Sequence, residues 1–252
     1  MKTALITGAT SGIGLEFAKR LAERGYRLIV TGRRVERLKL LKSEVDVPVE
    51  IISGDLSKRK ECFKLLQKLE TESIDVFINN AGFGVAGSFL ETDIDKEVNM
   101  LKVNDMAMHI LFKGILKKMN ATNSGQILNV ASSAGLLPGG PYMAGYYASK
   151  AYVTSLTRAV AVELKERHSN VKVAALCPGP VDTEFNERAD VVFALKGISP
   201  KKCVSDALKG MDKGKTIIVP GFTMKFVMAF QHLLPIPILI RMTGHQQKKK
   251  LG

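Results

Sequence analysis

The amino-acid sequence predicts an α/β fold of one domain, in which about seven strands form a doubly wound parallel sheet. Short apolar runs alternate with longer helical stretches, which is the pattern of such a sheet. The 252 residues are 46% hydrophobic, enough to bury a large core, and no linker or repeat divides the chain. The predicted strands are Lys2–Thr7, Tyr26–Thr31, Val49–Ser53, Asp75–Asn80, Gln126–Ala131, Val171–Cys177 and Lys215–Val219.

A glycine-rich loop follows the first predicted strand. The segment from Thr7 to Gly14, Thr-Gly-Ala-Thr-Ser-Gly-Ile-Gly, precedes an amphipathic helix. A strand, a glycine loop and a helix N-terminus together form a phosphate-binding unit. Gly8 allows a tight turn, Gly12 lets the backbone approach a pyrophosphate, and Gly14 lets the helix pack closely on the sheet. The spacing is G-x-x-x-G-x-G rather than G-x-G-x-x-G.

A tyrosine and a lysine four positions apart are the strongest candidates for chemistry. Tyr146 and Lys150 lie on a predicted helix, so their side chains project from one face, one turn apart. The unperturbed pKa of tyrosine is about 10, and a nearby ammonium group lowers it by stabilising the phenolate. Such a pair can move a proton onto or off an oxygen. The spacing alone also fits a tyrosine at the core edge beside a solvated lysine.

The glycine loop and the Tyr-Lys pair together resemble the short-chain dehydrogenase/reductase family, and further motifs follow in the family's order. Gly54-Asp55-Leu56 ends the third strand, Asn79-Asn80-Ala81-Gly82 ends the fourth, and the segment 177–183 ends the sixth. The resemblance spans about residues 2–183 and implies a Rossmann-type fold with NAD(P)-dependent oxidoreductase activity. The catalytic residues that it implies are Asn104, Ser132, Tyr146 and Lys150.

The resemblance also implies which residues bind the nicotinamide dinucleotide. They lie in the glycine loop, at the carboxyl ends of strands, and on the tyrosine helix. In chain order they are Gly8, Thr10, Ser11, Gly12, Ile13, Gly14, Arg33, Arg34, Asp55, Leu56, Asn80, Ala81, Gly82, Tyr146, Lys150, Pro178, Gly179, Val181 and Thr183. Their position at strand ends agrees with where open α/β sheets bind ligands.

Two arginines at the end of the second strand predict a preference for NADP over NAD. An enzyme that prefers NAD usually has an acidic residue there, against the adenosine ribose. A carboxylate repels the 2′-phosphate of NADP, whereas a guanidinium binds it. Arg33 is the main candidate and Arg34 an auxiliary. The alternative is that both simply open a surface helix.

The resemblance assigns a role to each catalytic residue. Tyr146 would give its proton to a carbonyl oxygen, while Lys150 would lower the Tyr146 pKa and bind the nicotinamide ribose. Asn104 would kink its helix and hold a water that links Lys150 to solvent. A serine would polarise the carbonyl. Ser132 lies three residues before Gly135, the usual family spacing, and Ser133 lies thirteen before Tyr146, another common spacing.

Two apolar segments near the C-terminus bear on the substrate and on partners. The segment 184–200 is expected to cover the substrate, and its apolar residues predict a lipophilic carbonyl or alcohol. These are Phe185, Val191, Val192, Phe193, Ala194 and Leu195.

We divide the domain into a catalytic part, 1–221, and an arm, 222–252. Prolines and polar residues in the arm argue against a membrane span. The arm either packs on a subunit or over the substrate site, which we favour, or lies on a membrane.

The composition limits the remaining function classes. The net charge of +13 comes from basic residues scattered over helices, so we expect no nucleic-acid partner. Three cysteines show no metal-ligand spacing, so we expect no metal site. The first residues already form a strand, so we expect no signal peptide and a cytoplasmic location.

The family resemblance also predicts the assembly. Relatives pair the Asn104 helix and the tyrosine helix across two-fold axes, which predicts a homodimer or homotetramer.

The function that we predict is hydride transfer between NADPH and a lipophilic carbonyl or alcohol. One alternative is a non-catalytic dinucleotide-binding regulator on the same fold. Another is an epimerase or dehydratase of the same family. Retention of all four catalytic residues argues against the regulator, since a sensor needs no proton donor.

Overall fold

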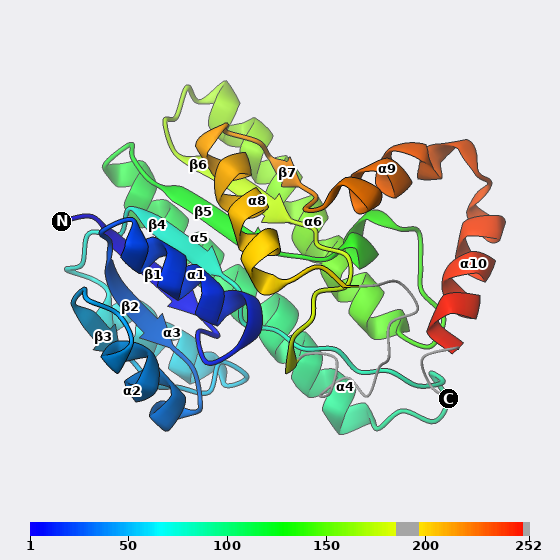
Figure 1. The fold of residues 1–252 in the computed structure, drawn as a ribbon, viewed down its shortest axis with the longest axis horizontal. Helices are drawn as coiled ribbons and strands as arrows, with labels where there is room; N and C mark the ends of the chain where they lie inside the picture. The colour runs from blue at the N-terminus through cyan, green and yellow to red at the C-terminus, as the bar shows by residue number, and fades with distance from the viewer. Residues whose placement is uncertain (185–196, 249–252) are drawn as a thin grey trace.

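The computed structural model describes residues 1–184 and 197–248, and in these ranges it contains one parallel sheet of seven strands, as predicted. The strand order is β3-β2-β1-β4-β5-β6-β7 (Figure 1). The strands are β1 Thr3–Thr7, β2 Arg27–Thr31, β3 Val49–Ile51, β4 Val76–Asn79, β5 Gln126–Val130, β6 Lys172–Leu176 and β7 Ile217–Ile218. The chain moves outward from β1 to β3 and then returns to β4, so the order reverses between β1 and β4. A crevice opens at such a reversal, beyond the carboxyl ends of the strands.

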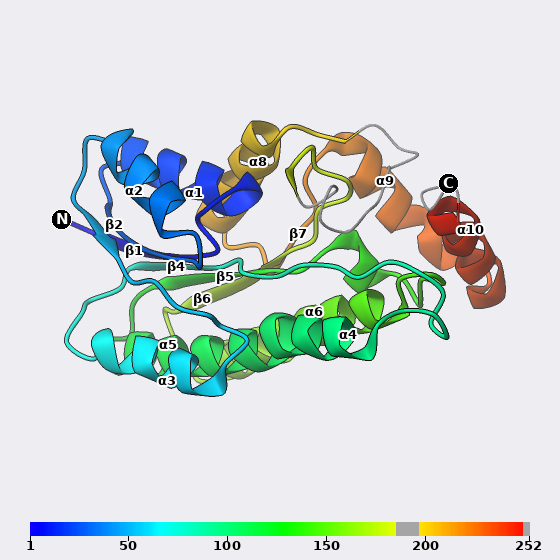
Figure 2. The same cartoon turned by 90° about the horizontal axis from the view of Figure 1, so that it is seen from below.

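Helices cover both faces of the sheet (Figure 2). On one face lie α1 Gly12–Glu23, α2 Val35–Ser43 and α8 Pro200–Asp212; on the other lie α3 Arg59–Lys68, α4 Ile94–Leu101, α5 Met108–Ala121 and α6 Ala144–Glu166. A π-helical turn, Lys102–Ala107, joins α4 to α5, and a 3₁₀ turn, Ser133–Leu136, follows β5. The two layers bury the strands on both faces, which explains why they are nearly continuous apolar runs.

Alternate residues of each strand supply two separate cores. Ile6 and Val30 pack with α1 and α8, whereas Leu5 and Phe77 pack with α3, α5 and α6.

Capping residues set where the helices begin. At the start of α8, for example, the Ser199 hydroxyl accepts a hydrogen bond from the Lys202 N–H, one of the groups that a helix leaves unpaired at its N-terminus.

The C-terminal arm forms two helices beyond the end of the sheet, at the right of Figure 1. They are α9 Phe222–Phe230 and α10 Ile236–Lys248, with a 3₁₀ turn, Gln231–Leu233, between them. Two hydrogen bonds hold α10 on the domain, one from Thr243 Oγ1 to the Gly139 carbonyl and one from Gln247 Nε2 to the Tyr147 hydroxyl. No helix in the described ranges is both long and apolar enough to span a bilayer.

Candidate active site

A cavity of about 490 Å³ lies at the carboxyl ends of the strands and brings together most of the predicted site residues. Those on its lining are Gly8, Thr10, Ser11, Gly12, Ile13, Arg33, Asp55, Leu56, Asn80, Ala81, Gly82, Ser132, Tyr146, Lys150, Pro178, Gly179, Val181 and Thr183. The other predicted residues, Gly14, Arg34 and Asn104, are not on this lining. The apolar lid residues predicted between 185 and 195 lie outside the described part of the chain.

The glycine loop is held in the shape that the sequence predicts. Gly8 and Gly12 have φ angles of +68° and +55°, a region that side chains with a Cβ rarely adopt. A Cβ on Gly14 would collide with the Gly8 carbonyl oxygen, so this glycine permits close packing of helix on loop. Asn80 fixes the loop from the next strand, since its Nδ2 donates to the Thr7 carbonyl at 2.9 Å.

The cavity wall formed by this loop fits an anionic group such as a pyrophosphate. The Ser11 side chain makes no capping hydrogen bond at the start of α1. The first backbone N–H groups of a helix are unpaired within the helix, and they attract anions. Ser11, Gly12 and Ile13 all line the cavity, so these donors border the space that a dinucleotide would fill.

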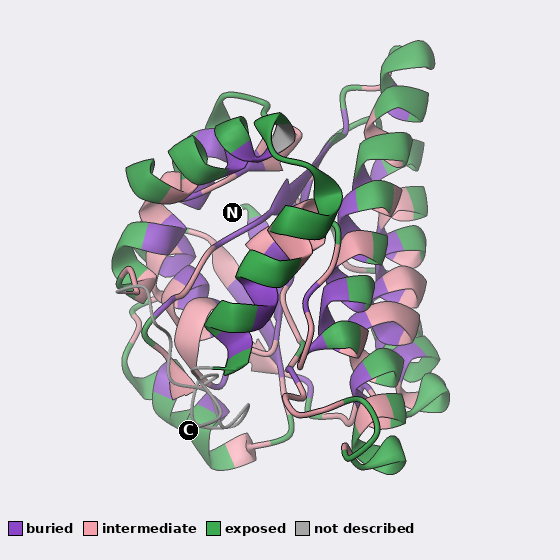
Figure 3. Ribbon diagram, turned by 90° about the vertical axis from the view of Figure 1, so that its right-hand side faces the viewer, coloured by how far each residue is buried: buried purple, intermediate pink, exposed green. Residues whose placement is uncertain are grey.

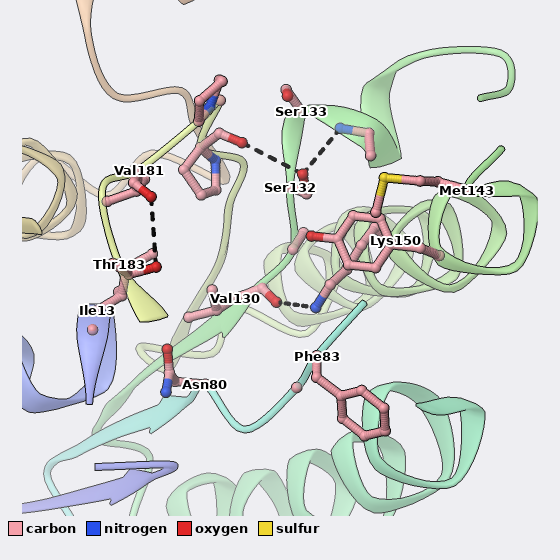
Figure 4. Close-up of a pocket in the computed structure, with 18 of the residues that line it drawn as sticks. Ile13, Asn80, Phe83, Val130, Ser132, Ser133, Met143, Lys150, Val181 and Thr183 are labelled. Atoms are coloured by element: carbon pink, nitrogen blue, oxygen red, sulfur yellow. Dashed lines mark hydrogen bonds between the residues drawn. The ribbon is translucent and has the colours of Figure 1, made fainter. Parts of the chain in front are cut away.

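Tyr146 and Lys150 both lie on α6, and both are buried against the cavity. The Lys150 ammonium donates a hydrogen bond to the Val130 carbonyl at 3.0 Å (Figure 4). It lies 5.8 Å from the centre of the Tyr146 ring. The helix therefore places an acid and a cation one turn apart, as the spacing predicts.

Burial, rather than the charge of Lys150, is the main influence on the pKa of Tyr146 in this structure. Burial raises the pKa of Tyr146 to about 12, and a hydrogen bond with the Ser132 side chain opposes this rise only in part. The Lys150 ammonium is directed at the Val130 carbonyl, and burial lowers the pKa of Lys150 to about 8. Desolvation is the largest cause of the shift for both groups, and the sequence argument did not consider it.

Ser132, rather than Ser133, is the serine whose side chain lowers the pKa of Tyr146. The Ser132 hydroxyl also accepts from the Ala134 N–H at 3.2 Å. Ser133 lines the same cavity, but in Figure 4 Ser132 lies between Ser133 and Lys150. Both serines therefore line the cavity, and Ser132 is the one that influences the phenol of Tyr146.

Asn104 lies in the π-helical turn between α4 and α5, so its helix is locally widened at this residue. Its amide nitrogen donates to the Phe83 carbonyl at 2.9 Å and to the Ser149 hydroxyl at 3.1 Å. A Cβ on Gly82 would lie within 3.3 Å of both the Asn104 amide oxygen and the Lys150 ammonium. A side chain at position 82 would therefore press on both groups.

Asp105, which is not on the cavity lining but interacts electrostatically with Lys150, is a residue that the sequence analysis missed. Its Oδ1 atom is buried and has no hydrogen-bond partner among the described residues. Burial raises the pKa of Asp105 to about 6, while the charge of Lys150 lowers it. In turn the charge of Asp105 raises the pKa of Lys150 and partly offsets the effect of burial. A signal was present in the sequence, since an acidic residue directly follows the proposed catalytic asparagine.

We expect Asp105→Asn to lower the pKa of Lys150 below its value of about 8, because the variant removes a negative charge that favours the ammonium. Lys150 would then lose its charge at a lower pH, and affinity for an anionic dinucleotide would begin to fall at that lower pH. Titration of NADPH fluorescence across about pH 6 to 9 measures this shift. An unchanged midpoint in the variant would contradict the coupling.

The two arginines at the end of β2 have different surroundings. Arg33 lines the cavity beside Asp55, whose pKa is raised by burial but lowered more by hydrogen bonds from Ser57 and by the charges of Arg33 and Lys58. Arg34 is directed elsewhere: its guanidinium donates to Glu184 at 2.8 Å and to the Thr10 hydroxyl at 3.1 Å. Arg33 is therefore available to a ligand in the cavity, whereas Arg34 would first have to leave its ion pair.

The C-terminal arm forms a wall of the cavity that the sequence analysis did not assign residue by residue. Its lining side chains are Met224, Val227, Met228, Leu239, Met242, Thr243, Gln246 and Gln247. A Cβ on Gly179 would lie 2.6 Å from Met224, so α9 packs directly on the loop after β6. The structure therefore shows the inner side of the arm over the cavity of its own chain.

A doubly wound sheet, a glycine loop at the reversal of strand order, and a buried Tyr-Lys pair in one cavity define an oxidoreductase that uses a nicotinamide dinucleotide. Residues 2–191 match the short chain dehydrogenase family, and the chain belongs to it. It is 30% identical over 230 residues to an uncharacterized oxidoreductase of Staphylococcus saprophyticus. The matched residues cover 89% of this chain and 97% of that protein.

Two solved structures extend the likeness. One is a short-chain dehydrogenase from Sphingobium yanoikuyae in complex with NADPH, with 29% identity, a TM-score of 0.82, and coverage of 92% of this chain and 95% of that chain. The other is the bulky-bulky ketone specific alcohol dehydrogenase from Comamonas testosteroni, with 28% identity, a TM-score of 0.77, and coverage of 92% and 93%. Both agree with the fold and with the oxidoreductase class.

Proposed function

We propose that this protein uses NADPH to reduce the carbonyl group of a lipophilic compound to an alcohol. The observation that carries this proposal is the composition of the cavity. Tyr146, Ser132 and Lys150 lie on one wall, while Met224, Leu239 and other apolar side chains of the arm form another. A site with few polar groups and a large apolar wall selects ligands by apolar contact and orients them by hydrogen bonds.

The cofactor residues act by binding and orientation. Bound NADPH would supply the hydride. The glycine loop would hold the pyrophosphate through backbone N–H groups, and Arg33 would bind the 2′-phosphate. Asp55 and Leu56 would border the adenine, and Pro178, Gly179, Val181 and Thr183 would border the nicotinamide. One solved relative, the short-chain dehydrogenase from Sphingobium yanoikuyae, is in complex with NADPH. That complex supports the choice of NADPH as the cofactor in this proposal.

Tyr146 would donate the proton to the carbonyl oxygen. Its pKa of about 12 keeps the phenol protonated at neutral pH, which suits a proton donor in the reductive direction. The Ser132 side chain lines the same cavity and lowers the pKa of Tyr146, so its hydroxyl would hold and polarise the carbonyl oxygen that receives the proton. Lys150 would hold the nicotinamide ribose, and Asn104 would keep a path for proton return through a water beside Lys150.

The substrate class can be tested with a series of ketones of increasing chain length, followed by the loss of NADPH absorbance. Each methylene that contacts the arm should raise kcat/KM about two- to fourfold until the cavity is full. Leu239→Ser should flatten this dependence and spare the shortest ketones. A series with no dependence on chain length, or NADPH that is not consumed with any ketone, would contradict the proposal.

We further propose a homodimer or homotetramer in the cytoplasm. Cys62, Cys177 and Cys203 are free and buried, which suits a reducing compartment. Tyr152 and Val162 expose 40% and 56% of their surface on α6, the helix that the family resemblance predicts to pair. Sedimentation velocity at micromolar concentration should show an oligomer, and a monomer alone would be the contrary result.

A further inference from the structure

The side of the C-terminal arm that faces away from the cavity is apolar and exposed. Phe222, Leu233 and Ile236 expose 85%, 75% and 60% of their surface. Four more exposed apolar residues of the arm are Phe226, Phe230, Leu234 and Ile238. We call these seven residues the outer face. In Figure 3, which views the molecule from the side of the arm, α10 lies in front and presents exposed positions to the viewer. Clustered exposure of this kind marks an interaction surface.

The geometry of α9 separates this surface from the cavity. Phe222, Phe226 and Phe230 follow one another at intervals of four residues, so they form one stripe. The Phe226 and Phe230 rings are in contact, with centroids 4.3 Å apart. Met224 and Met228 face the cavity instead. The same short helix therefore has an inner side that contacts the candidate substrate site and an outer side with no cover among the described residues.

The charge of the arm indicates what would cover it. Residues 222–252 contain five Lys or Arg residues and no Asp or Glu, although the whole chain has 24 acidic residues. Lys225, Arg241 and Lys248 are exposed on the two helices. Basic side chains beside exposed Phe, Leu and Ile are the composition of a helix that lies in an anionic lipid interface. A second copy of the chain paired on this face would bring like charges together.

We propose that α9 and α10 dock on the surface of a bilayer that contains anionic lipids. The outer face would enter the boundary between headgroups and acyl chains, and Lys225 and Arg241 would contact the headgroups. No described helix is long and apolar enough to cross the bilayer, so the arm would lie along it. Because the inner side of the arm lines the cavity, a lipophilic carbonyl compound could pass from the bilayer to Tyr146. This route for the substrate rests on the proposed function, whereas the docking itself does not.

Docking can be measured without any substrate. The full-length protein is sedimented with vesicles of phosphatidylcholine, with or without phosphatidylglycerol. We expect binding to the vesicles with phosphatidylglycerol, at least about tenfold weaker binding to phosphatidylcholine alone, and a further loss as salt rises. The variant Phe226→Ser with Phe230→Ser should weaken binding at least about tenfold, since each ring loses its apolar burial.

A second variant, Lys225→Glu with Arg241→Glu, should abolish the preference for anionic vesicles. The matched control replaces one exposed apolar and one exposed basic residue on α2, at the far end of the sheet from the arm. It is Leu40→Ser, a residue that is 56% exposed, with Lys42→Glu. The control should bind like the wild type. Wild-type protein that ignores anionic vesicles, or arm variants that bind as well as the control, would overturn the docking proposal.

Two further readouts separate docking from the proposed activity. All variants should reduce a short, water-soluble ketone as the wild type does, because the changed residues do not line the cavity. The Phe226→Ser with Phe230→Ser variant should be slower than the control only when a long-chain ketone is embedded in anionic vesicles. Failure of every ketone would overturn the proposed function and leave vesicle binding intact. Loss of an oligomer in this variant, with no vesicle binding, would assign the outer face to a second copy instead.

Discussion

Replacement of Tyr146 by phenylalanine should lower turnover by roughly two to four orders of magnitude, which is the usual contribution of a general acid. The variant keeps the ring and therefore the packing of a residue that is buried against the cavity. It removes the only part of the side chain that can hydrogen-bond with Ser132 and give a proton to a carbonyl oxygen. NADPH affinity should stay nearly unchanged. Steady-state kinetics with a soluble ketone and a fluorescence titration of NADPH measure the two effects.

Tyr147→Phe is the matched control for this experiment. Tyr147 is the next residue of α6 and also lines the cavity, but its hydroxyl accepts a hydrogen bond from Gln247 at 2.7 Å. The control removes one hydroxyl from the same wall, so we expect a change of at most about tenfold, the scale of one neutral hydrogen bond. Near-normal turnover of Tyr146→Phe, or an equal loss in both variants, would show that Tyr146 is not the proton donor.

The parts of this molecule that the sequence predicts are those set by local patterns. Each strand is an apolar run that a parallel sheet buries on both faces, and each predicted strand lies within about two residues of an observed one. Tyr146 and Lys150 share a helix face because their spacing matches one turn. Gly8 and Gly12 adopt positive φ angles because a tight loop between a strand and a helix requires them.

The parts that the sequence does not predict depend on contacts between distant positions. The ion pair of Arg34 with Glu184 joins residues 150 positions apart. The hydrogen bond of Gln247 with Tyr147, which holds the arm over the cavity, joins residues 100 apart. The raised pKa of Tyr146 is of the same kind, because its cause is burial by several elements rather than the nearby lysine. Local spacing carries no information on such desolvation.

Arg33→Asp should reverse the preference for NADPH over NADH. Arg33 lies on the cavity wall at the end of β2, where a guanidinium can bind a 2′-phosphate with two charge-assisted hydrogen bonds. Such bonds are worth about 1.5–3 kcal/mol, or roughly ten- to more than a hundredfold in affinity. An aspartate would also repel the phosphate and accept hydrogen bonds from the ribose hydroxyls of NADH. Dissociation constants for both cofactors, measured by fluorescence, give the effect.

Arg37→Asp is the control for net charge, because it makes the same change of charge four positions further along the chain. Arg37 is exposed and paired with Glu184, and it does not line the cavity. If the binding of NADPH depended only on the overall positive field, the two variants would weaken it alike. If Arg33 binds the 2′-phosphate directly, Arg33→Asp alone should weaken NADPH strongly, spare NADH, and leave the proton transfer of Tyr146 unchanged once cofactor is saturating. A wild type that binds NADH as tightly as NADPH would show that Arg33 is only a surface arginine.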